Sequence, residues 1–330
     1  MKITDWAALF VIIVAPILWL SGLRTEQLRE VNRLETRYNA AMRTAVQDAA
    51  AVLNRNELQQ FESGYGSAKW MRVDKEQALD TLLRSLYLNF GVADDPVGQQ
   101  TLMGYIPAVI IIDYDGYYLY AADVDPSSDT SAYHWRDKRP YTYVDANGNS
   151  IAFTLDSQVT AYDAATERWV SGPQAEVKAE TSIPLLQSEA QFDAVRRATI
   201  VRRIEEDLAR TIHLHNLLIK HQGVNYTFTL PTIPQEEWNN TLDDVGILVF
   251  LQGIPVGDHD YNNYALGGGR LDQKPTLLGA VDPRTGLKYA YRESCTAAHR
   301  LGYRVEEIFA GERDAAESGY FPLDCRAIQP

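Results

Sequence analysis

A stretch without a charged residue, from Trp6 to Leu23, constrains this chain more than any other feature. A run of about 18 apolar or small residues is the lower limit for a helix that crosses a membrane. A cleaved signal peptide has a basic start, a shorter apolar core and a cleavage site of small residues. Here Lys2 is offset by Asp5, and no Ala-x-Ala sequence follows the core. We therefore predict a retained transmembrane anchor at residues 1–23.

A helix without Gly or Pro is predicted to follow directly, because neither residue occurs from Leu23 to Phe61. Small and apolar residues recur in it at intervals of three and four, which places them on one face. This stripe consists of Val31, Leu34, Tyr38, Ala41, Ala45 and Ala49. Its small side chains allow another helix to approach closely. Two interpretations stay open: a helical stalk at residues 24–62 whose stripe is a packing interface between subunits, or the first helix of a globular domain.

The segment FVIIVAPILWLSGLRTEQLREVNRLETRYNAAMRTAVQDAAAVL, residues 10–53, resembles the N-terminus of the TadE/TadG-like pseudopilins of tight-adherence pili. Those proteins have a single N-terminal membrane helix that continues into an Ala-rich amphipathic helix. The chain departs from a processed prepilin, since no leader with a Gly precedes the apolar run. The resemblance implies an exported structural subunit of a pilus or secretion system. Its partners would be the membrane and other subunits, copies of itself included.

Residues 63–290 are predicted to form an α+β domain in which an antiparallel β-meander packs with helices on one face. Asp115-Gly116 and Asn147-Gly148 each separate two strand-like runs, as in hairpins, and the segment VTAYDAATERWVSG is a looser third case. Two further strands are expected at YTFTLP and GILVFLQGIPV. The segment ALGGGRLDQK reads as a flexible or tightly turned loop.

Two helices are predicted in this domain. The first is capped by Asp74 and stops at Gly91, with Ala78, Leu79, Leu82, Leu83 and Leu86 on its buried side. The second ends at Gly223, and its apolar positions face a core: Val195, Ile200, Ile204, Leu208, Ile212 and Leu217.

The hairpin IIDYDGYYLY is also similar to part of the extracellular Cache/PAS-like sensor domains, in which such strands line a ligand pocket. This resemblance implies an alternative function as a ligand-binding sensor that acts through a partner. Its pocket would be lined by Tyr117, Tyr118 and Tyr120.

The search for catalytic or metal-binding patterns favours a protein that is not an enzyme, without cofactor or metal. Asp113 and Asp115 fit a hairpin turn better than a calcium loop, because Gly116 follows at once. The segment Asp258–Asp260 is expected to be a solvated loop. His213 and His215 are two apart on a helix and therefore point to different sides.

An acidic and amide-rich cluster at Glu236, Glu237, Asp243 and Asp244 leaves a glycosidase-like carboxylate pair open. A capped helix followed by a strand explains the same cluster more simply. GxSxG, HExxH and phosphate-loop motifs do not occur.

The only two cysteines, Cys295 and Cys325, lie close to the C-terminus. They are expected to form a local disulfide in an oxidising compartment, the alternative being two unrelated thiols. Residues 291–330 also resemble a degenerate Ada-like metal-binding module. The matching residues are Cys295, Phe309, Ala315, Ala316, Gly319, Tyr320, Pro322 and Cys325. Leu323 stands where that module has a cysteine, and structural zinc needs four ligands. The resemblance therefore implies a module that has lost its zinc site and is held together by a disulfide between Cys295 and Cys325. The alternative is a residual metal site that includes His299.

The formal net charge of −13 argues against nucleic acid as a partner, because phosphate binding needs clustered Lys and Arg. The charges that flank the apolar stretch bear on which side of the membrane the large domain lies. Under the positive-inside rule, Arg24, Arg29, Arg33 and Arg37 would place the large domain in the cytoplasm. The cysteines and the pseudopilin resemblance favour the opposite side. We therefore expect a single-pass protein of the cell membrane whose large domain is extracytoplasmic.

Overall fold

The computed structural model describes residues 3–53, 67, 72–123, 132–221, 226–269, 277–292, 302–309 and 312–323. The chain divides into two compact units. The first consists of Met1–Gly66 and Trp70–Leu271, and the second of Ser67–Lys69 and Asp272–Pro330. The second unit thus begins upstream of residue 291, where the sequence analysis places the start of the C-terminal tail.

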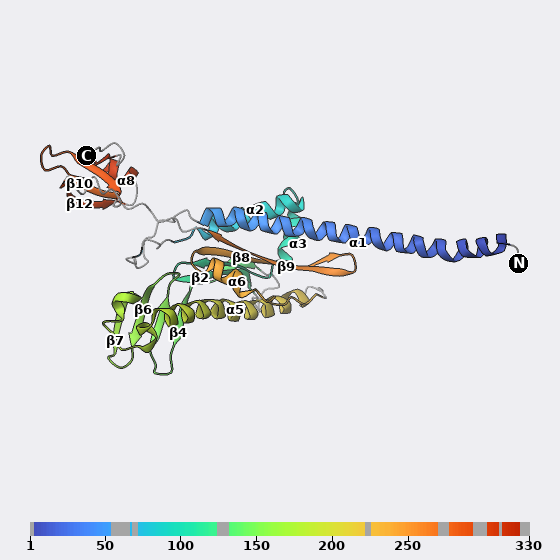
Figure 1. The fold of residues 1–330 in the computed structure, drawn as a ribbon, viewed down its shortest axis with the longest axis horizontal. Coiled ribbons are helices and arrows are strands. Elements are labelled where there is room, and N and C mark those ends of the chain that lie inside the picture. Colours follow the sequence, from blue (N-terminus) through green and yellow to red (C-terminus); the bar gives the residue numbers. More distant parts are fainter. Residues whose placement is uncertain are drawn as a thin grey trace. The chain divides into compact units, whose positions relative to one another are not determined.

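The first unit has an α+β fold, as predicted: a long N-terminal helix, and a curled antiparallel sheet packed with helices (Figure 1). Its helices are α1 (Ile3–Leu53), α2 (Lys75–Phe90), α3 (Pro96–Gly104), α4 (Gln174–Val177), a 3₁₀ turn (Pro184–Gln187), α5 (Glu189–His221) and α6 (Gln235–Thr241). Its strands are β1 (Val109–Asp113), β2 (Gly116–Asp123), β3 (Ala132–Trp135), β4 (Arg139–Val144), β5 (Ser150–Phe153), β6 (Gln158–Asp163), β7 (Arg168–Pro173), β8 (Val245–Val256) and β9 (His259–Gly269).

The strands of this sheet follow the order β7-β6-β5-β4-β2-β1-β8-β9, and β3 pairs with β2. All pairings are antiparallel. The three predicted hairpins are confirmed as β1–β2, β4–β5 and β6–β7. The β2–β4 pairing spans only two residue pairs, and Gly116 is required there because a Cβ would lie 2.5 Å from the Arg139 carbonyl oxygen.

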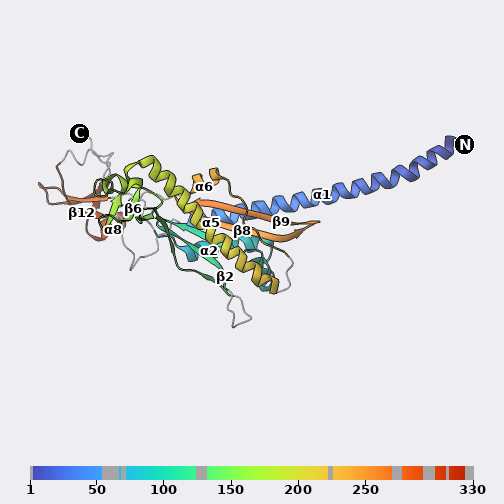
Figure 2. The same ribbon diagram turned by 90° about the horizontal axis from the view of Figure 1, so that it is seen from below.

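Helices cover both faces of the central strands, so the prediction that they pack on one face was wrong. α1 and α2 lie on one side of the sheet and α5 lies on the other (Figures 1 and 2). The reason is visible in β1, whose five residues are all buried. A strand with one solvated face would alternate between buried and exposed residues. In β5 and β6, farther along the sheet, buried residues alternate with partly exposed ones.

Helix α1 is continuous, and its C-terminal part belongs to the core. Ala45, Ala49 and Leu53 are fully buried against the rest of the first unit. The close approach depends on glycines in β9: a Cβ on Gly267 would lie 2.5 Å from Val46 Cγ1. Residues 265–269 belong to strand β9, so the prediction of a loop was wrong there, and residues 270–274 of the same segment lie outside the described residues.

The predicted helix caps are confirmed for α2. The Asp74 side chain accepts a hydrogen bond from the Gln77 backbone, and Gly91 ends the helix with a φ of 73°. Two other expectations fail. Leu217 of α5 is 45% exposed, although its spacing placed it on the buried face. The segment YTFTLP, residues 226–231, does not form a strand.

The second unit contains a four-stranded sheet in the order β12-β10-β11-β13. Its elements are β10 (Leu277–Val281), β11 (Lys288–Arg292), β12 (Arg304–Phe309), α8 (Glu312–Glu317) and β13 (Phe321–Pro322). A small core holds them together, with Phe309 and Tyr320 in ring contact at 5.0 Å. Cys295, Cys325 and His299 lie outside the described residues, and with them the expected disulfide and its metal-binding alternative.

Candidate functional site

The N-terminal half of α1 exposes a row of large apolar side chains. They are Phe10, Val11, Ile12, Ile13, Ile17, Leu18, Trp19, Leu20, Leu23 and Leu28. Among the described residues, this is the one helix that is long and apolar enough to cross a membrane, although a signal sequence has the same properties. An apolar surface of this extent marks contact with lipid or with protein. It is the first candidate site of the chain.

The predicted packing stripe lies farther along the same helix and is covered by the chain itself. Ala41, Ala45 and Ala49 are buried. Val31, Leu34 and Tyr38 are half-buried against the same core. Tyr38, for example, stacks on Phe90 of α2 at 5.0 Å and contacts the ring of Tyr261 in β9 edge-on at 5.3 Å.

Polar contacts join the β8–β9 hairpin to α1 where the helix leaves the domain. His259 Nε2 lies 2.8 Å from Glu35 Oε1. One helical turn farther on, the Tyr261 hydroxyl donates to Asn39 Oδ1 at 2.6 Å, and the Asn263 amide donates to the same oxygen. The loop expected at Asp258–Asp260 is thus a turn and a strand end that touch α1. The apolar half and the sheet are coupled through one continuous helix.

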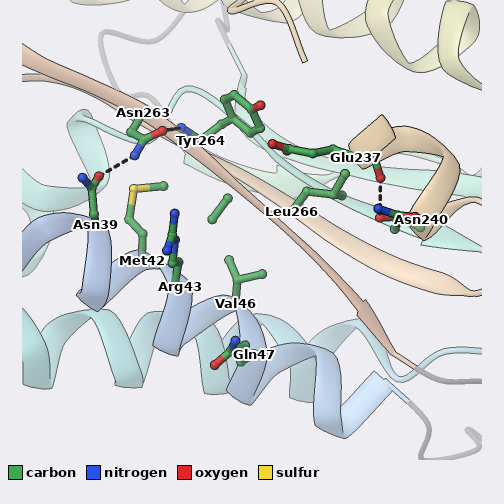
Figure 3. Close-up of a pocket in the computed structure, with 12 residues that line it drawn as sticks. Asn39, Met42, Arg43, Val46, Gln47, Glu237, Asn240, Asn263, Tyr264 and Leu266 are labelled. Carbon is green, nitrogen blue, oxygen red and sulfur yellow. Dashed lines mark hydrogen bonds between the residues drawn. The ribbon is translucent and has the colours of Figure 1, made fainter. Parts of the chain in front are cut away.

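A second candidate is a cleft of about 390 Å³ between α1, α6 and β9 (Figure 3). β9 is the last strand of its sheet, so the cleft lies along a sheet edge. α1 contributes Asn39, Met42, Arg43, Val46 and Gln47, α6 contributes Glu237, Asn240 and Thr241, and β9 contributes Asn263–Leu266. Sequence reasoning named Glu237 only as a member of an acidic cluster and missed the rest. No motif signals such a cleft, since its walls are far apart in sequence.

A third candidate is a cavity of about 360 Å³ whose wall includes Tyr87, Tyr120, Tyr133 and His215. Of the three tyrosines expected to line a sensor pocket, only Tyr120 does so. Burial lowers the pKa of His215 to about 4, so the imidazole is neutral at pH 7. Its Nε2 lies 3.2 Å from the Gly104 carbonyl oxygen, which can only accept, so this nitrogen carries the proton.

The other two tyrosines serve the packing of the sheet. Tyr117 donates a hydrogen bond to Asp207 of α5, and Arg139 lies 2.7 Å from the same carboxylate. Tyr118 lies beneath the ammonium groups of Lys75 and Lys138, which are 5.5 and 5.6 Å from its ring centroid. These contacts tie β2 to α5 and to the loop before β4.

Asp113 ends β1 and Asp115 lies in the hairpin turn that follows, as predicted, and both carboxylates pair with one lysine. Lys138 Nζ lies 2.9 Å from Asp113 Oδ2 and also contacts Asp115. Burial, opposed by Lys138, raises the pKa of Asp113 to about 6. Among the described residues, no group of three or more His, Cys, Asp or Glu side chains could hold a metal ion.

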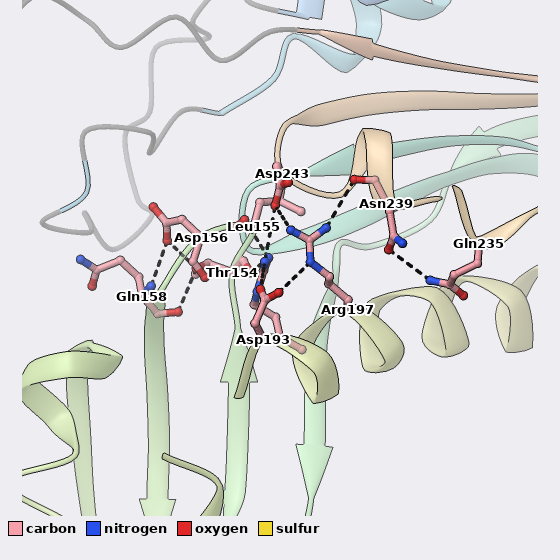
Figure 4. Close-up of polar contacts among 10 residues, drawn as sticks. Thr154, Leu155, Asp156, Gln158, Asp193, Arg197, Gln235, Asn239 and Asp243 are labelled. Atoms are coloured by element: carbon pink, nitrogen blue, oxygen red, sulfur yellow. Dashed lines mark hydrogen bonds and ion pairs between the residues drawn. The ribbon is translucent and has the colours of Figure 1, made fainter. Parts of the chain in front are cut away.

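The members of the acidic cluster before β8 have different surroundings: Asp243 forms ion pairs with arginines of α5, whereas Glu237 lines the cleft. Asp243 binds Arg197 of α5, which also contacts Asp193 (Figure 4). The neighbouring Arg196 is buried and donates to the Leu155 carbonyl oxygen at 2.7 Å. These arginines fasten α5 to the β5–β6 turn and to the segment before β8. Asp243 is thereby engaged in an ion pair. Glu236 and Glu237 lie on a short helix and Asp243 and Asp244 between it and a strand, as the simpler interpretation expected, but no side chain caps that helix.

The remaining sequence-based expectations concern single side chains. His215 is buried and His213 is exposed, which confirms that they point to different sides of α5. Comparisons with protein-family models, with curated proteins and with solved structures found no match.

Proposed function

We propose that this protein is a membrane-anchored structural subunit, a pseudopilin-like component of a tight-adherence-type pilus or secretion system. The observation that carries the proposal is the division of α1. One helix of 51 residues exposes apolar side chains in its first half and is packed into a folded domain by its second half. Such a helix would hold the domain at a membrane or within an assembly of parallel helices.

Because the stripe is buried, we place the proposed assembly surface nearer the N-terminus of the helix than the stripe. Ala41, Ala45 and Ala49 are covered by the protein's own sheet and by α2, so they leave little room for another subunit. The apolar side chains between Phe10 and Leu28 remain uncovered. In this proposal they contact lipid before assembly and copies of α1, or related helices, within the assembly.

The large domain is proposed to lie outside the cytoplasm, in a single-pass arrangement. The pseudopilin resemblance favours this side, whereas the four arginines after the apolar stretch favour the other. A single labelling experiment decides between them. A cysteine placed at exposed Ser157 should react with a membrane-impermeant maleimide on intact cells, with detergent-opened cells as the reference. Labelling only after opening would contradict the proposed topology.

The assembly role is tested by shearing intact cells, pelleting high-molecular-weight material and blotting the pellet and the membranes for this protein. Recovery in the sheared pellet is expected. Recovery in membranes alone would contradict a filament subunit and leave a fixed anchor.

A second candidate function is supported by the third site. The cavity beside Tyr120 and His215 has the size of a small-molecule site, and its wall combines aromatic and aliphatic side chains with polar groups. A sensor would bind a small molecule there and act through a partner. A small-molecule panel should then raise the melting temperature. Gly104→Leu, which places a bulky side chain in the cavity, should abolish the response, and Tyr162→Phe, outside the cavity, should leave it intact. A flat response to the whole panel would count against this function.

A further inference from the structure

The cleft between α1 and α6 contains the free edge of β9. β8 is the only strand paired with β9 among the described residues. The Tyr264 backbone N–H donates to the Asn263 side chain at 2.8 Å, so it points away from β8, and a strand added at this edge would replace that hydrogen bond. Because the two sides alternate along an antiparallel strand, the N–H and C=O of Leu266 also face the cleft. An open edge of this kind is a template for another extended chain.

The two rims of the cleft carry opposite charges (Figure 3). On the α1 rim, Asn39, Arg43 and Gln47 follow at four-residue intervals along one face. Arg43 is exposed and has no ion pair with any described residue. On the α6 rim, Glu237 accepts a hydrogen bond from the Tyr264 hydroxyl. Burial, together with that hydrogen bond, raises the pKa of Tyr264 to about 12, so the hydroxyl stays neutral at pH 7.

We propose that this cleft binds an extended peptide segment of a partner protein, which adds to β9 as a further strand. Side chains alternate between the two faces of a strand. The peptide would therefore turn an acidic side chain toward Arg43 and the next, basic, side chain toward Glu237. Main-chain hydrogen bonds supply affinity in this mode and the alternating side chains supply specificity. About four residues of β9 line the cleft, roughly 14 Å of strand.

The occupant follows from the chemistry of the edge. Backbone donors and acceptors spaced along a strand are matched by another extended backbone, and the charged rims match a neighbouring acidic–basic pair. The inference goes beyond the proposed function, because it does not depend on how α1 contacts lipid or other helices. A protein that fails the shearing test can still bind the peptide, and the reverse also holds.

The test uses the full chain in lipid nanodiscs and fluorescence polarisation with three labelled seven-residue peptides of valine and threonine. The first carries adjacent glutamate and lysine at its centre. The second places the two charges two residues apart, on the same face. The third repeats the first with alternate backbone nitrogens methylated, which removes main-chain donors. The first peptide is expected to bind about tenfold tighter than either of the others, since two or so net hydrogen bonds or one charge pair are lost.

Two variants locate the binding. Arg43→Glu should weaken the first peptide about tenfold and favour a version with lysine in place of glutamate. The matched control, Arg33→Glu, alters an exposed arginine of the same helix outside the cleft and should change nothing. Amide hydrogen exchange at Leu266 should slow when the first peptide is added.

Clear outcomes overturn the proposal. Equal binding of the methylated peptide excludes main-chain pairing, and equal binding of the same-face peptide excludes the two-rim arrangement. An equal loss in Arg43→Glu and Arg33→Glu reports a general charge effect. No binding of any peptide up to millimolar concentration, with unchanged exchange at Leu266, excludes a peptide site at this edge.

Discussion

His259 Nε2 lies 2.8 Å from Glu35 Oε1, and this contact joins the β8–β9 turn to α1 at the point where the helix leaves the domain. Asp258 lies on the other side of the imidazole, 3.2 Å from Nδ1. At the same turn, a Cβ on Gly257 would lie 2.6 Å from Val31 Cγ2, so backbone and helix are also in close contact. The turn therefore rests on α1 through one ionisable contact and one steric contact.

The contact should be pH-dependent. The hydrogen bond with Glu35, and then that with Asp258, raises the pKa of His259. A raised pKa in the folded state means that the contact contributes fully below the ordinary histidine pKa of about 6.5 and is lost as pH rises through the folded value. An NMR titration should give His259 a pKa above the ordinary value, and hydrogen exchange in the β8–β9 turn should quicken as pH rises through it.

The variant Glu35→Gln should bring the pKa of His259 back toward the ordinary value. Glu26→Gln, an exposed change on the same helix, is the matched control and should leave it unaltered. If both variants behave like the parent protein, Glu35 does not hold the imidazole.

Two adjacent glycines of β9 should differ sharply in their tolerance of a methyl group. In Gly267→Ala the new Cβ would lie 2.5 Å from Val46 Cγ1 and 3.3 Å from the Val46 carbonyl oxygen, so the Val46 side chain or α1 itself must shift. In Gly268→Ala the nearest atom is 3.9 Å away. Overpacking typically costs about 1–3 kcal/mol, so the first change should lower the free energy of unfolding by that amount and the second should be near neutral. Urea denaturation measures both. Equal stabilities would mean that α1 does not press on β9.

These glycines illustrate which features of the fold could be predicted from the sequence and which could not. Local signals were sufficient for the hairpin at Asn147-Gly148 and for the Asp74 cap, because each depends on neighbouring residues. Three consecutive glycines look the same in the sequence whether they form a flexible loop or a strand against which a helix packs closely. Only the packing of α1, more than 200 residues earlier in the chain, decides between the two. The cleft was missed for the same reason.

The apolar stripe of α1 shows that a pattern can predict a buried helix face without identifying what covers it. Its periodicity correctly indicated a buried helix face, yet periodicity does not say what buries it. Ala45 is covered by the chain's own core, and a variant such as Ala45→Glu would therefore test folding before it tested assembly. The polar contacts of the sheet, such as Tyr117 with Asp207, also join distant residues and left no pattern in the sequence.

The pairing of Lys138 with Asp113 should matter more at neutral than at acidic pH. In Lys138→Met the buried Asp113 takes up a proton instead of remaining charged, so the cost is limited to the free energy by which Lys138 favours its ionised form. At pH 7, one pH unit above the pKa of Asp113, Lys138→Met should therefore lower the free energy of unfolding by about 1–2 kcal/mol. Asp113 has a raised pKa of about 6, so its own contribution to stability is full below its ordinary pKa and falls as pH rises through 6.

The cost of Lys138→Met should accordingly shrink as the pH is lowered below 6, where Asp113 becomes neutral. Guanidinium denaturation of the variant and the parent at pH 5 and pH 7 gives the two differences. Lys178→Met removes an exposed lysine and is the control. A difference that stays constant between the two pH values would show that Asp113 does not respond to Lys138.

A charge in the apolar half of α1 should release the protein from the membrane without unfolding it. Ile13 is 54% exposed, so Ile13→Asp removes no contact on which the folded domain depends. A carboxylate near the centre of a spanning helix costs about 2.5–3.5 kcal/mol on insertion scales. Carbonate extraction should then move Ile13→Asp into the soluble fraction, while the melting temperature of the domain stays that of the parent protein. Thr25→Asp, an exposed change beyond the apolar stretch, should remain with the membranes. If Ile13→Asp also remains there with unchanged stability, lipid does not hold α1, and the apolar side chains must be covered by another protein.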